Sequence, residues 1–299
     1  YEICLSDWSS DVCSSDLLRR LRETLGDDLV RREGHGITPT PFALALWPSV
    51  RAALDQLQSA LVPQHFVPLE ARNSFVLAMA DATAAELMGG LAQRLEHQAP
   101  SVSIRVLPLT TRDPRNLLED GRVDMALGYF PAVLADLTAK AQSGEALSFE
   151  HHRLYDGEYV CVMRRGHPLA QKNITLEEFC NSRHLLVSFS GRPYGFIDEA
   201  LASIGQQRRV VMTVNQFFTA GRMVVNSNLL TVLPRHFVPT TGIADELFLC
   251  DLPFKVPTLH VDAVWHRRKH AQSDHVWLRD VIIDIAQDVF KVGNSGVPS

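Results

Sequence analysis

Basic side chains near the start of the chain have the types and spacing that suit contact with phosphate groups. Leucines recur at helical spacing over residues 18–25, and arginines occupy the other faces of this stretch. The segment "LVRREGHGITPT" follows, with two more arginines and a histidine. The candidate phosphate-contacting residues are Arg19, Arg20, Arg31, Arg32 and His35.

The elements that must position these side chains are a helix and a hairpin. Two short β-prone stretches flank the tight-turn composition of residues 34–36. A helix followed by a basic hairpin is how a winged helix ends, and the hairpin can reach phosphates or the minor groove of DNA. The alternative is that the arginines only solvate a surface helix, which is the commoner role for arginines taken alone.

Other groupings of reactive residues are weaker. His266 and His270 stand four apart and His151 and His152 are adjacent, but no carboxylate or cysteine joins either pair. The five cysteines are odd in number and widely scattered, which predicts neither a zinc site nor a disulfide framework. No nucleophile elbow of the hydrolase type is present, and we expect neither a metal nor a cofactor.

Composition sets the class of the protein. The 299 residues are 46% hydrophobic and 21% charged, as in ordinary globular proteins of about two domains. A net charge of -5 argues against a uniformly basic nucleic-acid binder and leaves room for a local basic patch. Neither a long apolar run nor a secretory signal pattern is present, so we expect a cytoplasmic protein without membrane contact.

A long helix is predicted to follow the basic hairpin, over residues 41–63. It opens at Pro41, and Pro48 should bend it. Its apolar residues recur every three or four positions and form one narrow seam, which favours a partner helix. The seam could equally pack against its own domain, and the period does not decide between the two. The seam residues are Leu46, Val50, Leu54, Leu57 and Leu61.

From residue 72 onward, strand and helix patterns alternate. The expected strands are 74–80, 102–109, 123–130, 159–165, 184–189, 210–214, 229–234 and 260–266. Helices are expected at 81–98, in a short segment that ends at Gly121, and at 196–205 and 274–290. This alternation predicts an α/β fold with parallel sheet covered on both faces.

Five motifs in order give the chain a family likeness. They are "LRRLRETLGDDLVRREGHGITPT", "LLEDGRVDMALG", "RLYDGEYVCVMRRGHPLA", "LLTVLPR" and "AVWHRRKHAQSDHVWLRDVI". From residue 18 to about residue 290 the chain resembles a LysR-type transcriptional regulator. Within that family it looks most similar to the branch that senses aromatic or nodulation-type compounds.

The resemblance implies an organisation in three parts. Residues 18–40 would be the remnant of a winged helix-turn-helix, and 41–63 the dimerising linker helix. Residues 72–299 would be a two-lobed effector domain similar to periplasmic solute-binding proteins. The first lobe would comprise 72–150 and 256–290, and the second 151–255. The implied function is a ligand-responsive DNA-binding regulator, not an enzyme, with DNA, a small effector and a second or further copies of itself as partners.

The first 17 residues depart from the family pattern. They are rich in Ser and Asp, begin without Met and lack a helical period. They resemble translated adapter sequence, and we expect an artefactual or disordered head and impaired DNA binding. A divergent but native N-terminal arm is the alternative.

The resemblance also implies where a ligand binds. In this two-lobed fold a small molecule lies between the lobes, where strand ends and helix N-termini meet. Mapped by motif, the effector residues are Asp81, Thr83, Thr110, Thr111, Phe130, Ser188, Phe189, Arg192, Phe217 and Phe218. Helix N-termini favour anions, whereas the Asp81 carboxylate would compete with one unless Arg192 or Arg222 pairs with it. We expect a partly apolar effector such as an aromatic acid.

Two other classes of function are open to such a fold. A free-standing receptor of the periplasmic type would make no use of the basic hairpin or the seam helix. An enzyme would need a nucleophile or an acid–base set in the cleft, where the sequence offers only Asp81, with Thr83 beside it.

Overall fold

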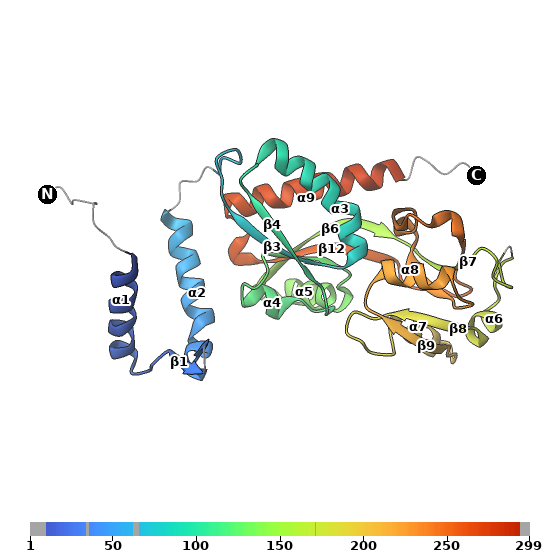
Figure 1. Cartoon of the computed structure of the whole chain (residues 1–299), viewed down its shortest axis with the longest axis horizontal. Helices are drawn as coiled ribbons and strands as arrows, with labels where there is room; N and C mark the ends of the chain where they lie inside the picture. Colours follow the sequence, from blue (N-terminus) through green and yellow to red (C-terminus); the bar gives the residue numbers. More distant parts are fainter. Residues whose placement is uncertain (1–9, 34–35, 62–65, 171, 294–299) are drawn as a thin grey trace. The chain divides into compact units, whose positions relative to one another are not determined.

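The computed structural model describes residues 10–33, 36–61, 66–170 and 172–293. It divides into two compact units, residues 1–62 and 63–299. Figure 1 shows the helices and strands of each unit. Among the described residues, no helix has both the length and the apolar character needed to cross a bilayer.

The first unit consists of two helices joined by a hairpin. Helix α1 (Ser10–Leu25) leads to the antiparallel strands β1 (Val30–Glu33) and β2 (Gly36–Pro39) and then to α2 (Pro41–Leu61). Gly26, at φ +65°, ends α1 in the left-handed conformation that favours glycine. The helix–hairpin–helix order is the one that the sequence pattern predicts.

Hydrogen bonds from Asp27 fix the base of the hairpin. Its Oδ1 accepts from the Leu29 backbone N–H and from the Thr40 hydroxyl, both at 2.7 Å. The buried Thr40 hydroxyl in turn accepts from the Ala43 N–H at 3.1 Å and so caps α2. These contacts hold Leu29 at the uncommon φ of 61° and lower the pKa of Asp27.

Helix α1 begins earlier than the sequence pattern predicts. The expected helix starts at Leu18, whereas the structure extends it back to Ser10. Asp16 stabilises this extension because its carboxylate pairs with Arg19 at 2.7 Å and Arg20 at 3.1 Å, one turn along the helix. Residues 10–17 are therefore helical, while residues 1–9 lie outside the described residues.

The second unit contains two lobes, and a five-stranded sheet is the centre of the first. Its order is β4 (Ser103–Pro108), β3 (Ser74–Met79), β5 (Met125–Gly128), β12 (Leu259–His266) and β6 (Phe149–Gly157). Helices α3 (Asp81–Gln98) and α9 (Ser273–Gly293) pack on one face, and α4 (Arg115–Glu119) and α5 (Pro131–Ser143) pack on the other (Figure 1). Both faces are covered, as the alternating pattern predicts.

The second lobe has a three-stranded antiparallel sheet and a two-stranded parallel one. The first has the order β10 (Thr231–Pro234), β7 (Tyr159–Arg164) and β11 (Leu247–Cys250), and the second pairs β8 (Arg183–Val187) with β9 (Arg209–Val214). Its helices are α6 (Leu176–Asn181), α7 (Phe196–Ser203) and α8 (Phe217–Val225). Short 3-10 turns occupy Arg235–Phe237, Pro239–Thr241 and Ala244–Glu246, and a fourth, Arg267–Lys269, precedes α9.

The prediction of parallel sheet is right for part of the molecule only. Strand β3 is parallel to β4 and β5, but β12 is antiparallel to β5 and β6, and β7 is antiparallel to β10 and β11. The antiparallel strands β6, β7, β11 and β12 flank the two lobe crossings, where the chain leaves a lobe and later returns. Strand β6 pairs with β12 in the first lobe, so the first crossing is at Glu158 and not at the predicted residue 150.

Candidate functional site

A narrow cavity of about 80 Å³ lies between the two lobes. The first lobe contributes residues at the ends of β3, β4 and β5 and on β6 and β12, and the second lobe contributes the start of β7 and residues near β8, α8 and β10. The lining residues are Ala80, Ala82, Thr83, Leu109, Thr111, Arg112, Gly128, Tyr129, Tyr155, Tyr159, Phe189, Phe217, Pro234, His236, Leu259 and Val261. This volume has room for several waters, and thus for a small ligand.

Three tyrosines are among the polar residues that line this cavity. Burial raises the pKa of Tyr129, Tyr155 and Tyr159, so that each phenol keeps its proton at neutral pH. The Thr83 side chain, which lines the same cavity, opposes this rise at Tyr155. A protonated phenol can donate to an oxygen of a ligand while its ring packs against apolar parts of the same ligand.

His236 behaves as an uncharged ring in this wall. Burial lowers its pKa to about 4. Its ring meets Tyr155 edge to face at 5.3 Å and Phe290 edge to face at 5.2 Å, measured between ring centroids. Neutral His236 therefore adds no charge to the cavity at neutral pH.

Arg112 is the one charged residue among those that line this cavity. Its guanidinium lies 5.4 Å from the Phe196 ring centroid and 5.9 Å from that of Tyr129. No described carboxylate lies within ion-pair distance of it, and the residue is exposed at the solvent side of the cavity. An unpaired guanidinium beside aromatic rings is suited to bind a carboxylate on a small planar molecule.

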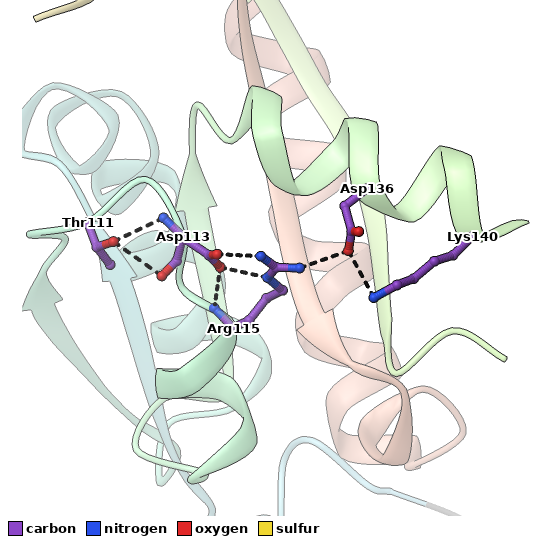
Figure 2. Close-up of polar contacts among 5 residues, drawn as sticks. All are labelled: Thr111, Asp113, Arg115, Asp136 and Lys140. Atoms are coloured by element: carbon purple, nitrogen blue, oxygen red, sulfur yellow. Dashed lines mark hydrogen bonds and ion pairs between the residues drawn. The ribbon is translucent and has the colours of Figure 1, made fainter. Parts of the chain in front are cut away.

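A network of ion pairs holds the loop that carries Arg112. Figure 2 shows Asp113, which accepts from Arg115 Nε at 2.8 Å, and Asp136 on α5, which accepts from Arg115 Nη1 at 2.8 Å. Lys140 lies 3.1 Å from the same Asp136 oxygen. Thr111 Oγ1 accepts from the Asp113 backbone N–H at 3.0 Å, which closes the turn around Arg112. The Arg115 guanidinium lowers the pKa of Asp113 and keeps its carboxylate ionised.

A second cavity of about 230 Å³ shares the lining residues Ala80, Leu109 and Phe189 with the first, and Asp81 on its wall makes a direct contact between the lobes. Asp81, at the start of α3, accepts a hydrogen bond of 3.0 Å from the Phe218 backbone N–H, at the start of α8. Glu86 accepts another from the Thr240 hydroxyl at 2.9 Å, and burial raises its pKa. These bonds bring α3 of the first lobe against the second lobe.

The basic residues of the first unit differ in whether a carboxylate pairs with them. Arg19 pairs with Asp16 and with Glu23, the latter at 2.8 Å, which raises its pKa. Arg31 and Arg32 on β1 are exposed, and no carboxylate among the described residues pairs with either. His35 lies outside the described residues. The hairpin arginines are therefore more available to phosphates than those of α1.

The seam of α2 is partly described. Leu54 is 54% exposed and Val50 is 37% exposed, and Leu46 is half-buried. Trp47 on the same helix is also 50% exposed. The side chains of Leu57 and Leu61 lie outside the described ones. So much apolar surface on one helix is characteristic of a contact surface.

Known proteins match this chain over most of its length. Residues 69–287 match the model of the LysR substrate binding domain. The transcriptional activator NahR of Pseudomonas putida is 31% identical over 92% of this chain and 88% of its own length. The chain belongs to the LysR family of transcriptional regulators.

Further comparisons agree with this LysR assignment. Nodulation protein D 2 of Sinorhizobium fredii is 26% identical over 93% of this chain and 85% of its own length. The crystal structure of a transcriptional regulator from Pseudomonas aeruginosa is 31% identical, covers 91% of this chain and 87% of its own, and has a TM-score of 0.68. These matches to NahR and to a nodulation protein agree with the branch of the family that the sequence motifs indicate. LysR proteins are regulators and not enzymes, and they bind DNA and small effectors.

The predicted effector residues of this LysR chain fall into three groups. Thr83, Thr111, Phe189 and Phe217 line the first cavity. Asp81 and Thr110 line the second, which Phe189 also borders. The residues that line neither cavity are Phe130, Ser188, Arg192 and Phe218.

The surroundings of these last four residues explain why they line neither cavity. Phe130 is fully buried in the core beneath α4 and α5, on the other side of the sheet edge. Ser188 is buried, and its backbone N–H donates to Val214. Phe218 packs edge to face on Phe237, with only its backbone directed to Asp81. Arg192 is exposed on the loop before α7.

Sequence reasoning missed the most polar part of the cavity. Arg112 directly follows the predicted Thr110 and Thr111, and attention to the whole strand end would have found it. Tyr155 and Tyr159 flank the lobe crossing, and His236 follows the end of β10. Their position between the lobes depends on antiparallel strands that the alternating pattern did not predict. Among the described residues, no group of three or more His, Cys, Asp or Glu side chains is placed to hold a metal ion.

Proposed function

We propose that this chain is a ligand-responsive DNA-binding regulator whose effector is a small aromatic carboxylate held in the 80 Å³ cavity. The observation that carries the proposal is the unpaired guanidinium of Arg112 beside a cavity lined by aromatic rings, hydroxyl groups and small apolar side chains. The carboxylate would pair with Arg112, and the ring would pack among Tyr155, Tyr159, Phe189 and Phe217.

Contacts between the lobes would couple binding to regulation. A ligand that touches both lobes stabilises the arrangement in which the Asp81–Phe218 bond also forms. Effectors of this kind typically shift such equilibria by about 1 to 3 kcal/mol. We infer that the shift is passed to DNA through the seam of α2, in a homodimer or homotetramer, with Arg31 and Arg32 at phosphates.

A comparison of three probe molecules tests the ligand class. Benzoate has a ring and a charge, benzamide has the ring without the charge, and cyclohexanecarboxylate has the charge without a planar ring. We expect only benzoate to raise the melting temperature of the full chain clearly at millimolar concentration. Equal effects of benzamide and benzoate would contradict the role of Arg112. Conversion of any probe would support an enzyme instead of a sensor.

A further inference from the structure

Two segments connect the lobes, and they lie side by side in the second lobe. The first runs through Glu158 into β7, and the second leaves β11 at Cys250 toward β12. Strands β7 and β11 are antiparallel neighbours. Arg235 also joins the two segments: its Nε lies 3.3 Å from Glu158 Oε2, and its Nη2 donates to Asp251. This pair of segments is called the hinge below.

The hinge carries two cysteines in register. Cys161 on β7 is the direct partner of Cys250 on β11, so their side chains lie on the same face of the sheet. Directly opposite residues of antiparallel strands have Cα atoms about 4.5 to 5.5 Å apart, within the range of about 4.4 to 6.8 Å found in disulfides. Their Cβ atoms are about 4.5 to 5.5 Å apart, slightly more than in a relaxed disulfide. A small closing movement would join the sulfurs in a bond that reduces readily.

The two thiols differ in exposure and in pKa, and both differences matter for thiol–disulfide exchange. Cys161 is fully buried, whereas Cys250 is partly exposed. The neighbouring Cys250 thiol and burial raise the pKa of Cys161, and the Cys161 thiol in turn lowers the pKa of Cys250. Cys250 is therefore the sulfur that a reagent in solution meets first, and the more readily ionised one.

We propose that Cys161 and Cys250 form a reversible disulfide that staples the hinge, with a low-molecular-weight disulfide as oxidant. The Cys250 thiolate attacks that disulfide, whose sulfur–sulfur bond breaks and releases one small thiolate. Cys161 then gives up its proton and attacks the Cys250 sulfur, which releases the second small thiol. Two protein thiols are oxidised, and one small disulfide is reduced to two thiols.

The staple would act on the same strand that enters the cavity. Tyr159 lines the cavity two residues before Cys161, and His236 lines it next to the hinge residue Arg235. A bond across β7 and β11 fixes the separation of these two strands in the second lobe, just beyond the point where each strand connects to the first lobe. The inference does not depend on the identity of the effector, and failure of either idea leaves the other standing.

Cys180 is the natural internal control. It is packed against the same core cluster as Cys161 and Cys250, but it lies on α6 and has no strand partner. Burial raises its pKa. The geometry thus selects one of the three pairs that these cysteines could form.

Oxidation in glutathione buffers tests the staple. The full chain is equilibrated over a range of ratios of oxidised to reduced glutathione. It is then unfolded in a denaturant that contains N-ethylmaleimide, which blocks free thiols, and it is digested for mass spectrometry. We expect a linked peptide pair, Cys161 with Cys250, that grows with oxidised glutathione and disappears on return to the reduced buffer. The oxidised chain should melt on the order of 5 °C higher than the reduced chain.

Variants separate this pair from its neighbours. Cys180→Ser should form the same linked peptides as the unmodified chain, and Cys161→Ser should accumulate a glutathione adduct on Cys250. If Cys161→Ser does not fold, the unmodified chain and Cys180→Ser still show whether Cys161 and Cys250 become linked. Recovery of Cys161 and Cys250 as free thiols in fully oxidised glutathione, or a link to Cys180, would overturn the proposal. A linked pair without a rise in melting temperature would overturn its action as a staple.

Discussion

At the scale of single residues, the charge of the cavity depends on one side chain. Of the residues that line it, Arg112 alone is charged, since burial keeps His236 neutral and the three tyrosines protonated. A single cation at the solvent side of an otherwise uncharged cavity favours anionic over neutral ligands. The selectivity of the cavity should therefore change when this one charge is removed.

Arg112→Gln should weaken benzoate binding about 10- to 100-fold, since a hydrogen-bonded charge contributes about 1.5 to 3 kcal/mol. Isothermal titration of the purified chain measures this change. Arg192→Gln is the matched control, because Arg192 is exposed and lines neither cavity. Equal losses in the two variants would argue against a specific ion pair at Arg112.

His236→Phe should make stability less sensitive to acid. The folded chain keeps His236 neutral down to a pKa of about 4, while the unfolded chain takes up a proton near 6.5. Because acid then favours the unfolded chain, the free energy of unfolding falls as the pH drops from 6.5 toward 4. Chemical unfolding at several pH values should give a shallower slope for His236→Phe than for the control His152→Phe, which changes an exposed ring. Identical slopes in the two variants would contradict the lowered pKa of His236.

Sequence reasoning placed some cavity residues and missed others, for reasons that can be named. Thr83 and Thr111 follow the ends of strands β3 and β4, and strand ends are visible in the hydrophobic pattern. Phe130 looked equivalent to them, but its ring is fully buried in the core with residues of α4 and α5. The direction of a side chain after a strand ends depends on the turn, and one sequence does not specify it.

At the scale of elements, the loop from β4 to α4 is the part that positions Arg112. Two ion pairs, Asp113 with Arg115 and Arg115 with Asp136, connect this loop to α5 (Figure 2). These side chains are about one-third to one-half exposed, so each pair contributes only modestly to stability. Their main effect would be to restrict the positions that Arg112 can adopt.

Arg115→Met should therefore weaken benzoate binding several-fold and lower the free energy of unfolding by only about 1 kcal/mol. Hydrogen exchange should become faster at the amides of 110–113 and stay unchanged in α9. Lys140→Met, which removes an outer member of the network, should have little effect on either measurement. Benzoate affinity unchanged in Arg115→Met would show that the network does not position Arg112.

The seam of α2 gives a second prediction at this scale. Leu54→Asp places a charge on a side chain that is 54% exposed in the single chain, and it should turn oligomers into monomers in sizing experiments. Ser49→Asp on the same helix is the control and should leave the oligomer intact. Unchanged oligomers in Leu54→Asp would exclude this seam as the contact.

Element positions were more predictable than strand directions. The hydrophobic period located β3, α3, β4 and α9 to within a few residues, because burial of one face imposes that period. It gave no sign that β12 runs antiparallel to β5, because a fully buried strand has the same composition in either direction. The early start of α1 was missed because Asp16 stabilises it through ion pairs and not through an apolar face.

At the scale of the whole molecule, the chain contains a basic hairpin, a helix with exposed apolar residues and a two-lobed ligand domain. Arg32→Ala should reduce by about one the slope of log affinity for DNA against log salt, because each phosphate contact contributes about -0.9 to that slope. Arg209→Ala, an exposed change in the second lobe, should leave the slope as it is. A slope that does not respond to Arg32→Ala would remove the hairpin from the DNA contact.

The central claim is that one ligand contacts both lobes at once. Hydrogen exchange of the full chain with and without saturating benzoate tests it most directly. We predict slower exchange in both lobes together, at the Arg112 loop and β6 in the first and at the start of β7 and of α8 in the second. Protection confined to one lobe, or no protection at all, would contradict the account.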